Sequence, residues 1–190
     1  MTCISSERTE SERGVALFET AIGTCGIAWN ERGITGVQLP EADRAATSAR
    51  LRQRFPDALE STTPVDVLLA IGRIVALLRG ERVDLTPVAL DLETVPAFDR
   101  DVYVAARAIP PGATRTYGEI AKQIGQPNAS REVGAALARN PFAIVVPCHR
   151  VVAANGKMGG FSAGGGVKTK LKLLAIEGGA GPLFDQTSTL

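Results

Sequence analysis

Apolar and polar residues alternate through residues 14–40, which is the pattern of half-buried β-strands. In GVALFETAIGTCGIAWNERGITGVQLP (residues 14–40), the apolar pairs Val15 with Leu17 and Ile27 with Trp29 are each two positions apart. Gly23 and the NERG tetrapeptide interrupt the alternation at turn-like points. Because successive side chains of a strand point to opposite faces, this segment predicts a meander of antiparallel strands.

The pattern then changes to helical spacing. EADRAATSARLRQRF (41–55) carries Ala45, Ala49 and Phe55 on one face. In the next predicted helix, Thr63 can be the cap residue, with Pro64 at the first helical position and Gly80 just past the end. Its apolar residues follow the helical spacing i, i+3, i+7 and i+10: Leu68, Ile71, Val75 and Leu78. VALDLE (88–93) predicts one more strand, and TVPAFDR (94–100) a linker.

The second half predicts three helices. FDRDVYVAARAI (98–109) is amphipathic and stops at a Pro-Pro-Gly sequence. Thr116 and Glu119 form a capping box that opens a helix over 117–125. After the turn QPN, Asn128 or Ser130 caps a helix over 129–140, whose predicted buried side is Val133, Ala136 and Leu137. Two helices joined by a short turn are typical of a helix-turn-helix unit, but also of helical hairpins with no DNA role.

The last of these helices has an unusually bare surface. Arg131 is the long basic side chain near its start, and the small residues on it are Ala129, Gly134, Ala135 and Ala138. Such a helix can approach a narrow minor groove with one projecting residue, or it can pack tightly against another helix. Both readings remain open from the residues alone.

Composition and charge narrow the class of protein. The 190 residues, 45% hydrophobic and 22% charged, fit a globular protein of one sizeable or two small domains. No apolar run reaches the roughly 18 residues of a membrane span, and the polar residues 1–14 predict a disordered leader rather than a secretory signal. Three cysteines without motif spacing, Cys3, Cys25 and Cys148, argue against a disulfide framework and favour a reducing, cytoplasmic location.

Charge is unevenly distributed along the chain. Residues 98–178 hold eleven Lys and Arg against five Asp and Glu, a net charge of +6, which leaves −5 for the rest of a chain whose formal net charge is +1. A basic half of this kind favours contact with a polyanion such as DNA, although a solvated basic face would have the same composition.

The segment NPFAIVVPCHRVV (140–152) carries the candidate chemistry. The only histidine, His149, stands directly after Cys148, where a protease-type pair would draw its members from distant parts of the chain. Either the pair lies by coincidence in a core segment, or the backbone bends after Pro147 to serve one site. The glycine-rich segment 156–170 matches neither phosphate-binding motif, and predicts either a loop that approaches a ligand or a surface hairpin.

These motifs together resemble the O6-alkylguanine-DNA alkyltransferases, also called methylated-DNA–protein-cysteine methyltransferases. The resemblance rests on PCHRVV, on GGFS after it and on a closing K-x-x-LL-x-x-EG, dense over 97–178 and fainter over 15–92. It implies an α/β + α architecture: a leader (1–14), a small N-terminal α/β domain with an RNase H-like arrangement (15–92), a mainly helical C-terminal domain with a winged helix-turn-helix-like DNA-binding unit (93–178), and a flexible tail (179–190).

The resemblance also implies the reaction centre. Cys148 accepts the alkyl group, a water molecule links its thiol to His149, and Glu177 orients the other imidazole nitrogen. Tyr117 donates to guanine N3 as the base departs, and Asn140 fixes the turn before the reactive segment. Arg150 is structural, in an ion pair.

The remaining implied contacts hold the base and the DNA. The backbone carbonyls of Cys148 and Val151 accept from the exocyclic amine of the base, and the Ser162 N–H faces O6. Lys170 matches the lysine that the family has seven residues before the glutamate. Arg131 enters the duplex in place of the flipped nucleotide, from a helix whose Ala129 and Ala135 also lie against the DNA.

The resulting functional hypothesis is DNA repair by a single-turnover transfer of an alkyl group from O6-alkylguanine, and less certainly from O4-alkylthymine, to Cys148. The alternatives are a Cys–His thiol hydrolase and a non-catalytic binder of alkylated DNA. Zinc-binding members need two cysteines and two histidines in the N-terminal half, so we expect neither metal nor cofactor here. The expected partner is double-stranded DNA bearing O6-alkylguanine, bound by a monomer, with cooperativity left open and no membrane involved.

Overall fold

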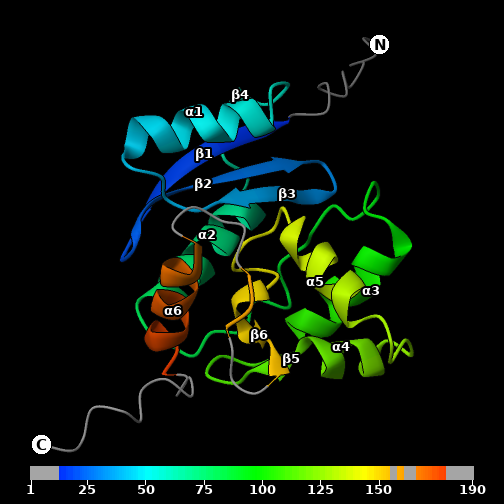
Figure 1. Cartoon of the computed structure of the whole chain (residues 1–190). Coiled ribbons are helices and arrows are strands. Elements are labelled where there is room, and N and C mark those ends of the chain that lie inside the picture. The colour runs from blue at the N-terminus through cyan, green and yellow to red at the C-terminus, as the bar shows by residue number, and fades with distance from the viewer. Residues whose placement is uncertain (1–12, 155–157, 161–165, 179–190) are drawn as a thin grey trace, which may run out of the picture.

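The computed structural model describes residues 13–154, 158–160 and 166–178 (Figure 1). The predicted tail, most of the predicted leader, Cys3 and Ser162 lie outside these residues. No helix within them is long and apolar enough to cross a membrane.

The N-terminal half is built on a four-stranded sheet in the order β3-β2-β1-β4. Strands β1 (Gly14–Thr20), β2 (Gly23–Asn30) and β3 (Gly33–Gln38) form the predicted antiparallel meander. β1 begins at the last residue of the predicted leader. β4 (Leu59–Glu60), which the alternation did not reveal, adds two residues parallel to β1.

The two faces of this sheet bury different residues. Cys25, Ile27 and Trp29 alternate on one face and join the large core shared with α2 (Val65–Leu78) and the C-terminal half. Burial raises the pKa of Cys25 to about 11, so this thiol is inert. Ala28 lies on the other face, beneath Leu51 of α1 (Arg44–Arg54).

Two glycines let α1 lie close to the sheet. A Cβ atom at Gly26 would lie 2.8 Å from Leu51 Cδ2, and one at Gly36 would lie 2.3 Å from Phe55 Cζ. α1 begins after Asp43, whose side chain accepts from the Ala46 N–H. The first helix is therefore fixed by a cap and by a face of the sheet that lacks side-chain bulk.

Three local predictions about the helices of this half are wrong. The predicted apolar face of α1 is the first, because Ala45 and Ala49 are exposed and Thr47 and Leu51 are buried instead. Pro64, not Thr63, is the cap residue of α2, because its extended ψ of 155° delays the helix to Val65. The buried face of α2 is Val67, Ala70, Ile74, Leu77 and Leu78, so the predicted stripe is rotated and Leu68 is 53% exposed. The helix is apolar on nearly all sides, so periodicity alone could not select the buried face.

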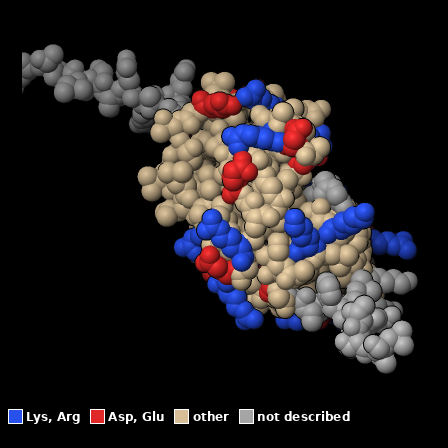
Figure 2. All heavy atoms as spheres, turned by 90° about the vertical axis from the view of Figure 1, so that its left-hand side faces the viewer, with Lys and Arg blue, Asp and Glu red and all other residues tan. Residues whose placement is uncertain are grey.

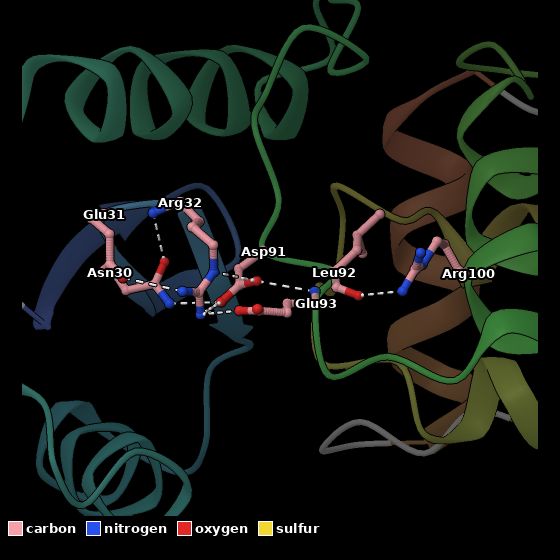
Figure 3. A network of polar contacts seen from close by, with 7 residues as sticks. All are labelled: Asn30, Glu31, Arg32, Asp91, Leu92, Glu93 and Arg100. Atoms are coloured by element: carbon pink, nitrogen blue, oxygen red, sulfur yellow. Dashed lines mark hydrogen bonds and ion pairs between the residues drawn. The ribbon is translucent and has the colours of Figure 1, made fainter.

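The segment VALDLE is not a strand but makes a single parallel bridge, Ile34↔Leu90, to the edge of β3. Figure 3 shows the polar network that holds it there. Asp91 accepts from the Asn30 amide at 2.6 Å and from the Arg32 guanidinium at 3.1 and 2.9 Å, and the hydrogen bond from Arg32 contributes most to lowering the pKa of Asp91 to about 2. Arg100 donates to the Leu92 carbonyl at 3.0 Å, which ties the same segment to the following helix.

The C-terminal half is mainly helical. Its elements are α3 (Ala97–Arg107), β5 (Arg115–Thr116), α4 (Tyr117–Gln123), α5 (Ser130–Ala138), the 3₁₀ turn η1 (Cys148–Arg150), β6 (Val151–Val152) and α6 (Gly166–Ile176). The capping box of Thr116 and Glu119 is confirmed. So is the buried side of α5.

Two boundaries in this half differ from the prediction. The linker is shorter, because α3 begins at Ala97. Neither Asn128 nor Ser130 caps α5, because the cap position falls on Ala129, which makes no side-chain bond. β5 pairs in parallel with β6, which brings the start of α4 beside the segment that follows Cys148.

Candidate active site

The apolar run after α5 folds into a turn instead of a strand. The Asn140 side chain closes the turn from both sides: its Oδ1 accepts from the Phe142 N–H and its Nδ2 donates to the Val146 carbonyl, each at 2.9 Å. Ile144 has a φ of 73°, a left-handed conformation that is costly for a β-branched residue. The turn is therefore held by these side-chain hydrogen bonds and by two isolated bridges, Ala143↔Val146 within it and Val37↔Phe142 to β3, and not by a continuous strand.

The predicted bend after Pro147 is present. Pro147 leads directly into η1, in which successive residues are about 120° apart around the axis. Cys148 is therefore half-buried at the wall of a pocket, while its neighbour His149 is buried in the interior. This geometry explains how adjacent residues can serve one site from different directions.

His149 belongs to a buried charged cluster around Glu177 at the end of α6. His149 Nε2 lies 2.9 Å from Glu177 Oε1. Arg150 binds the same carboxylate through Nε at 2.9 Å and Nη2 at 2.8 Å, so its predicted ion pair is confirmed. The third nitrogen of Arg150, Nη1, donates to the Ile109 carbonyl at 2.5 Å. Three donor nitrogens, one from His149 and two from Arg150, thus converge on one carboxylate, and the third nitrogen of Arg150 is bonded as well.

The cluster fixes the protonation state of the imidazole. Burial alone would raise the pKa of Glu177, but the bonds from His149 and Arg150 outweigh it and lower that pKa to about 2. Burial lowers the pKa of His149, against the opposing effect of Glu177. A neutral ring that donates from Nε2 to the carboxylate leaves Nδ1 as an acceptor. Nδ1 is buried and has no hydrogen-bond partner among the described residues.

The Cys148 thiol is protonated at rest. Burial raises its pKa, against the hydrogen bond from Asn140, the charge of Lys170 and the backbone N–H groups of Cys148 and His149. Those groups stabilise the thiolate once it forms, but a base must first take the proton. His149 Nδ1, which has no hydrogen-bond partner in the described part of the chain, can accept that proton.

Cys148 lines a pocket of about 730 Å³ whose walls come from α4, α5 and the segment after β6. Its lining includes Tyr117, Arg131, Gly134, Ala153 and Gly160. Tyr117 is the first residue of α4 and half-buried. The capping box and the β5–β6 pairing therefore place this phenol across the pocket from the sulfur.

Lys170 holds the backbone beside Tyr117. Its buried ammonium donates to the carbonyls of Val151 and Met158, each at 2.6 Å, and lies 5.9 Å from the centroid of the Tyr117 ring. Burial lowers its pKa to about 8. A Cβ atom at Gly159, which has a φ of +68°, would lie 2.6 Å from the Tyr117 hydroxyl. The ammonium thus holds the backbone that packs directly against the phenol.

Most of the predicted site residues come together here. Arg131 is exposed at the mouth of the pocket, Ala135 is exposed elsewhere on α5, and Ala129 is half-buried at its start. Ser162 lies outside the described residues. Sequence reasoning missed the Met158 and Ile109 carbonyls that accept from Lys170 and Arg150, since backbone acceptors leave no sequence signal.

Comparisons with known proteins identify the family. Residues 97–179 match the model of the 6-O-methylguanine DNA methyltransferase DNA-binding domain. A methylated-DNA–protein-cysteine methyltransferase of Methanosarcina acetivorans is 38% identical over 166 residues, which is 86% of this chain and 97% of that protein. The chain belongs to the methylated-DNA–protein-cysteine methyltransferase family. The predicted resemblance is thereby confirmed.

Solved structures agree with this family across both halves of the chain. The O6-methylguanine methyltransferase of Mycobacterium tuberculosis superposes with a TM-score of 0.70 at 34% identity, over 87% of this chain and 93% of that one. The same M. tuberculosis protein in complex with DNA superposes with a TM-score of 0.67, over 87% of this chain and 92% of that one. The methyltransferase fold therefore covers the N-terminal sheet as well as the helices around Cys148.

Replacing Glu177 by Gln tests the buried cluster. The side chains of Glu177 and Arg150 are 3% and 5% exposed, and removing one partner of such a pair leaves the other charge unpaired. We expect Glu177→Gln to lower the free energy of unfolding by about 3–5 kcal/mol in urea denaturation. Adding Arg150→Met removes the stranded charge, so the double variant should recover part of the loss. A double variant no more stable than Glu177→Gln would contradict this account.

Proposed function

We propose that this protein repairs O6-alkylguanine in DNA by moving the alkyl group to its own Cys148, once per molecule. The observation that carries the proposal is a pocket-lining thiol followed directly by a buried, neutral imidazole whose Nδ1 has no hydrogen-bond partner among the described residues. Membership of the family supports the same reaction. A relative from M. tuberculosis is described in complex with DNA, and DNA is the proposed partner here.

The proposed reaction begins with the thiol proton. A bridging water passes it from Cys148 to His149 Nδ1, and Glu177 stabilises the imidazolium through Nε2. The thiolate attacks the alkyl carbon, the carbon–sulfur bond forms and the bond from that carbon to O6 breaks. Tyr117 donates its proton to guanine N3, so that the base leaves as a neutral species.

The base is held by groups around the sulfur. The carbonyls of Cys148 and Val151 accept from its exocyclic amine, and Val151 can do so while bound to Lys170 because a carbonyl has two lone pairs. The Ser162 N–H is proposed to face O6. Asn140 holds the turn and contacts the thiol, so it acts on the nucleophile and not on the base.

We further propose that α4 and α5 form the helix-turn-helix part of a winged DNA-binding unit, and that the N-terminal sheet and its helices have an RNase H-like arrangement. Ala135 and Ala138 are exposed, which favours close approach to a minor groove over helix packing. Arg131 projects from the same helix at the pocket mouth and would fill the space of a flipped nucleotide. On the face drawn in Figure 2, the lower part carries mostly Lys and Arg, whereas acidic side chains accompany them in the upper part.

The hydrolase alternative lacks support in the geometry. A thiol hydrolase must clear a thioester by attack of water on a polarised carbonyl, whereas alkyl transfer leaves a thioether that water does not cleave. A non-catalytic binder of alkylated DNA would not need a thiol with a base beside it. Single-turnover repair uses both groups.

Intact mass measurement tests the acceptor and the stoichiometry. With excess O6-methylguanine duplex, each molecule should gain one methylene, located on the peptide that contains VVPCHR. Cys148→Ser should abolish transfer and still bind alkylated DNA, because Arg131 and Tyr117 are unchanged. Product well beyond one equivalent would refute the single-use reaction, and label on Cys25 or Cys3 would refute the site.

The pH dependence of the rate tests the base. Because the pKa of His149 is lowered and that of Cys148 is raised, neutral imidazole and protonated thiol coexist through neutral pH. The rate with free O6-benzylguanine should be nearly flat from about pH 6.5 to 7.5, below the range in which Lys170 loses its charge, and fall at lower pH as His149 is protonated. In His149→Ala the rate should be lower and rise about tenfold per pH unit, following direct thiol ionisation. A wild-type rate with that same slope would remove His149 from the proton transfer.

Two substrates separate the role of Arg131 from that of the reaction centre. Arg131→Ala should weaken repair of duplex DNA much more than reaction with free O6-benzylguanine, because only the duplex has a stack to fill, at a cost of a few kcal/mol. Exposed Arg115→Ala, which removes a positive charge outside the pocket, is the control for charge alone. Equal losses on both substrates would contradict the proposed insertion.

A further inference from the structure

The turn that precedes Cys148 is attached to the edge of the N-terminal sheet. The Val37 N–H of β3 donates to the Pro141 carbonyl at 2.8 Å, and Val37 and Phe142 form a parallel bridge. In Figure 1 this edge strand lies directly above the C-terminal half. The turn before Cys148 is therefore hydrogen-bonded to the outer edge of a sheet that belongs to the N-terminal half of the chain.

Arg54, the last residue of α1, spans this junction. Its Nη1 donates to the Val37 carbonyl at 3.1 Å and to Gln38 Oε1 at 2.9 Å, and its Nη2 donates to the Pro141 carbonyl at 3.2 Å. Pro141 thus accepts from Val37 and from Arg54 together. The guanidinium also stacks 5.2 Å from the centroid of the Phe55 ring. One rigid fork holds the sheet edge and the turn at the same time.

Hydrogen bonds within the turn connect Pro141 to the segment that carries the Cys148 sulfur. Pro141 stands between Asn140 and Phe142, which are themselves joined by the bond from the Phe142 N–H to Asn140 Oδ1. The amide of Asn140 donates to the Val146 carbonyl at 2.9 Å, and the same carbonyl accepts from the Cys148 N–H at 2.8 Å. The Asn140 side chain also acts against burial to lower the pKa of Cys148. A shift of the Pro141 carbonyl would therefore move the amide that stabilises the thiolate.

Arg54 lines a different cleft from the base pocket. It lines a second cleft, of about 1070 Å³, together with Gln38, Arg139, Asn140 and Cys148. Arg54 is absent from the lining of the pocket that contains Tyr117. Arg54 therefore meets the reactive segment through its hydrogen bond to the Pro141 carbonyl of the turn.

We propose that Arg54 is a positioning residue for Cys148, which holds the Asn140–Phe142 turn against the sheet so that the Asn140 amide meets the sulfur. The expected effect of Arg54 on alkyl transfer rests on the proposed function. The ionisation of Cys148 is a second consequence that does not depend on the substrate.

The test compares Arg54→Met, which keeps an apolar stem over Phe55 and removes the fork, with Arg54→Lys, which can still reach one carbonyl. Arg50→Ala is the matched control, because Arg50 lies one turn earlier on α1 and lines the same cleft, and its hydrogen bond within the described residues goes to Gln53 at 2.8 Å and not to the turn. Each variant is assayed below its unfolding temperature. The readouts are the saturating rate constant and half-saturating concentration for O6-benzylguanine, and the pH profile of iodoacetamide alkylation at Cys148.

In Arg54→Met the saturating rate constant should fall about ten- to a hundredfold with little change in the half-saturating concentration, the loss expected when a reacting group is misplaced by a fraction of an ångström to one ångström. The alkylation profile of Cys148 should move to higher pH, Arg54→Lys should recover part of both effects, and Arg50→Ala should match the wild type. His149, Glu177, Arg150 and Lys170 are unchanged in all variants, so the shift reports the turn.

Arg54→Met with a lower melting temperature but a wild-type rate constant and alkylation profile would assign Arg54 a purely structural role and overturn the proposal. If Arg54→Met does not fold, the double variant Arg54→Lys/Gln38→Ala replaces it, because this variant loses both the fork and its acceptor on Gln38. A wild-type rate constant and iodoacetamide profile in the double variant would then overturn the proposal. If the wild type transfers no alkyl group, the proposed function fails, and the iodoacetamide profiles still decide the positioning role.

Discussion

The carboxylate of Glu177 is the constraint around which this site is organised. A buried charge is tolerated only when it is paired and hydrogen-bonded, and Glu177 satisfies this by taking two donors from Arg150 and one from His149. The consequence for His149 is a fixed ring orientation, with the free nitrogen away from the carboxylate. The charge that stabilises the folded state is thus the one that selects the tautomer.

The same cluster joins distant parts of the chain. Glu177 closes α6, Arg150 reaches the Ile109 carbonyl after α3, and His149 stands in η1 beside the nucleophile. On the other side of Cys148, Arg54 and Val37 attach the preceding turn to the N-terminal sheet. The short segment that carries the thiol is therefore held at both ends by contacts remote in sequence, which is how a left-handed Ile144 can persist within it.

The elements that local chemistry determines were predicted from the sequence. The Thr116–Glu119 capping box specifies a helix start within four residues, and the alternation of residues 14–40 specifies a meander, because each depends on near neighbours. VALDLE has the composition of a strand but obtains only one bridge, since the edge of β3 is shared with the turn at Phe142. The α2 stripe was misplaced because an all-round apolar helix takes its orientation from its partners.

The residues of the site also divide into those with a local sequence signal and those brought in by tertiary contacts. Cys148 and His149 are adjacent and visible as a motif, but Glu177 lies 28 positions beyond His149 and was placed only by resemblance to the family. Arg54 is 87 positions from Pro141 and has no local signal, because an arginine at the end of an amphipathic helix is an ordinary solvated residue in sequence terms. Contacts made across the junction between the two halves are tertiary, and only the folded chain reveals them.

The environment of Tyr117 suits the timing of the proposed reaction. Burial raises the pKa of this phenol, and the negative charge of a Cys148 thiolate raises it further. That charge disappears when the sulfur takes the alkyl group, so the phenol becomes a better acid at the moment when guanine needs a proton to leave. The proton taken from Cys148 is meanwhile retained on His149 beside Glu177. A protein that reacts once needs no route to return that proton to the sulfur, so a fully buried base, which would hinder a turnover enzyme, is compatible with single use.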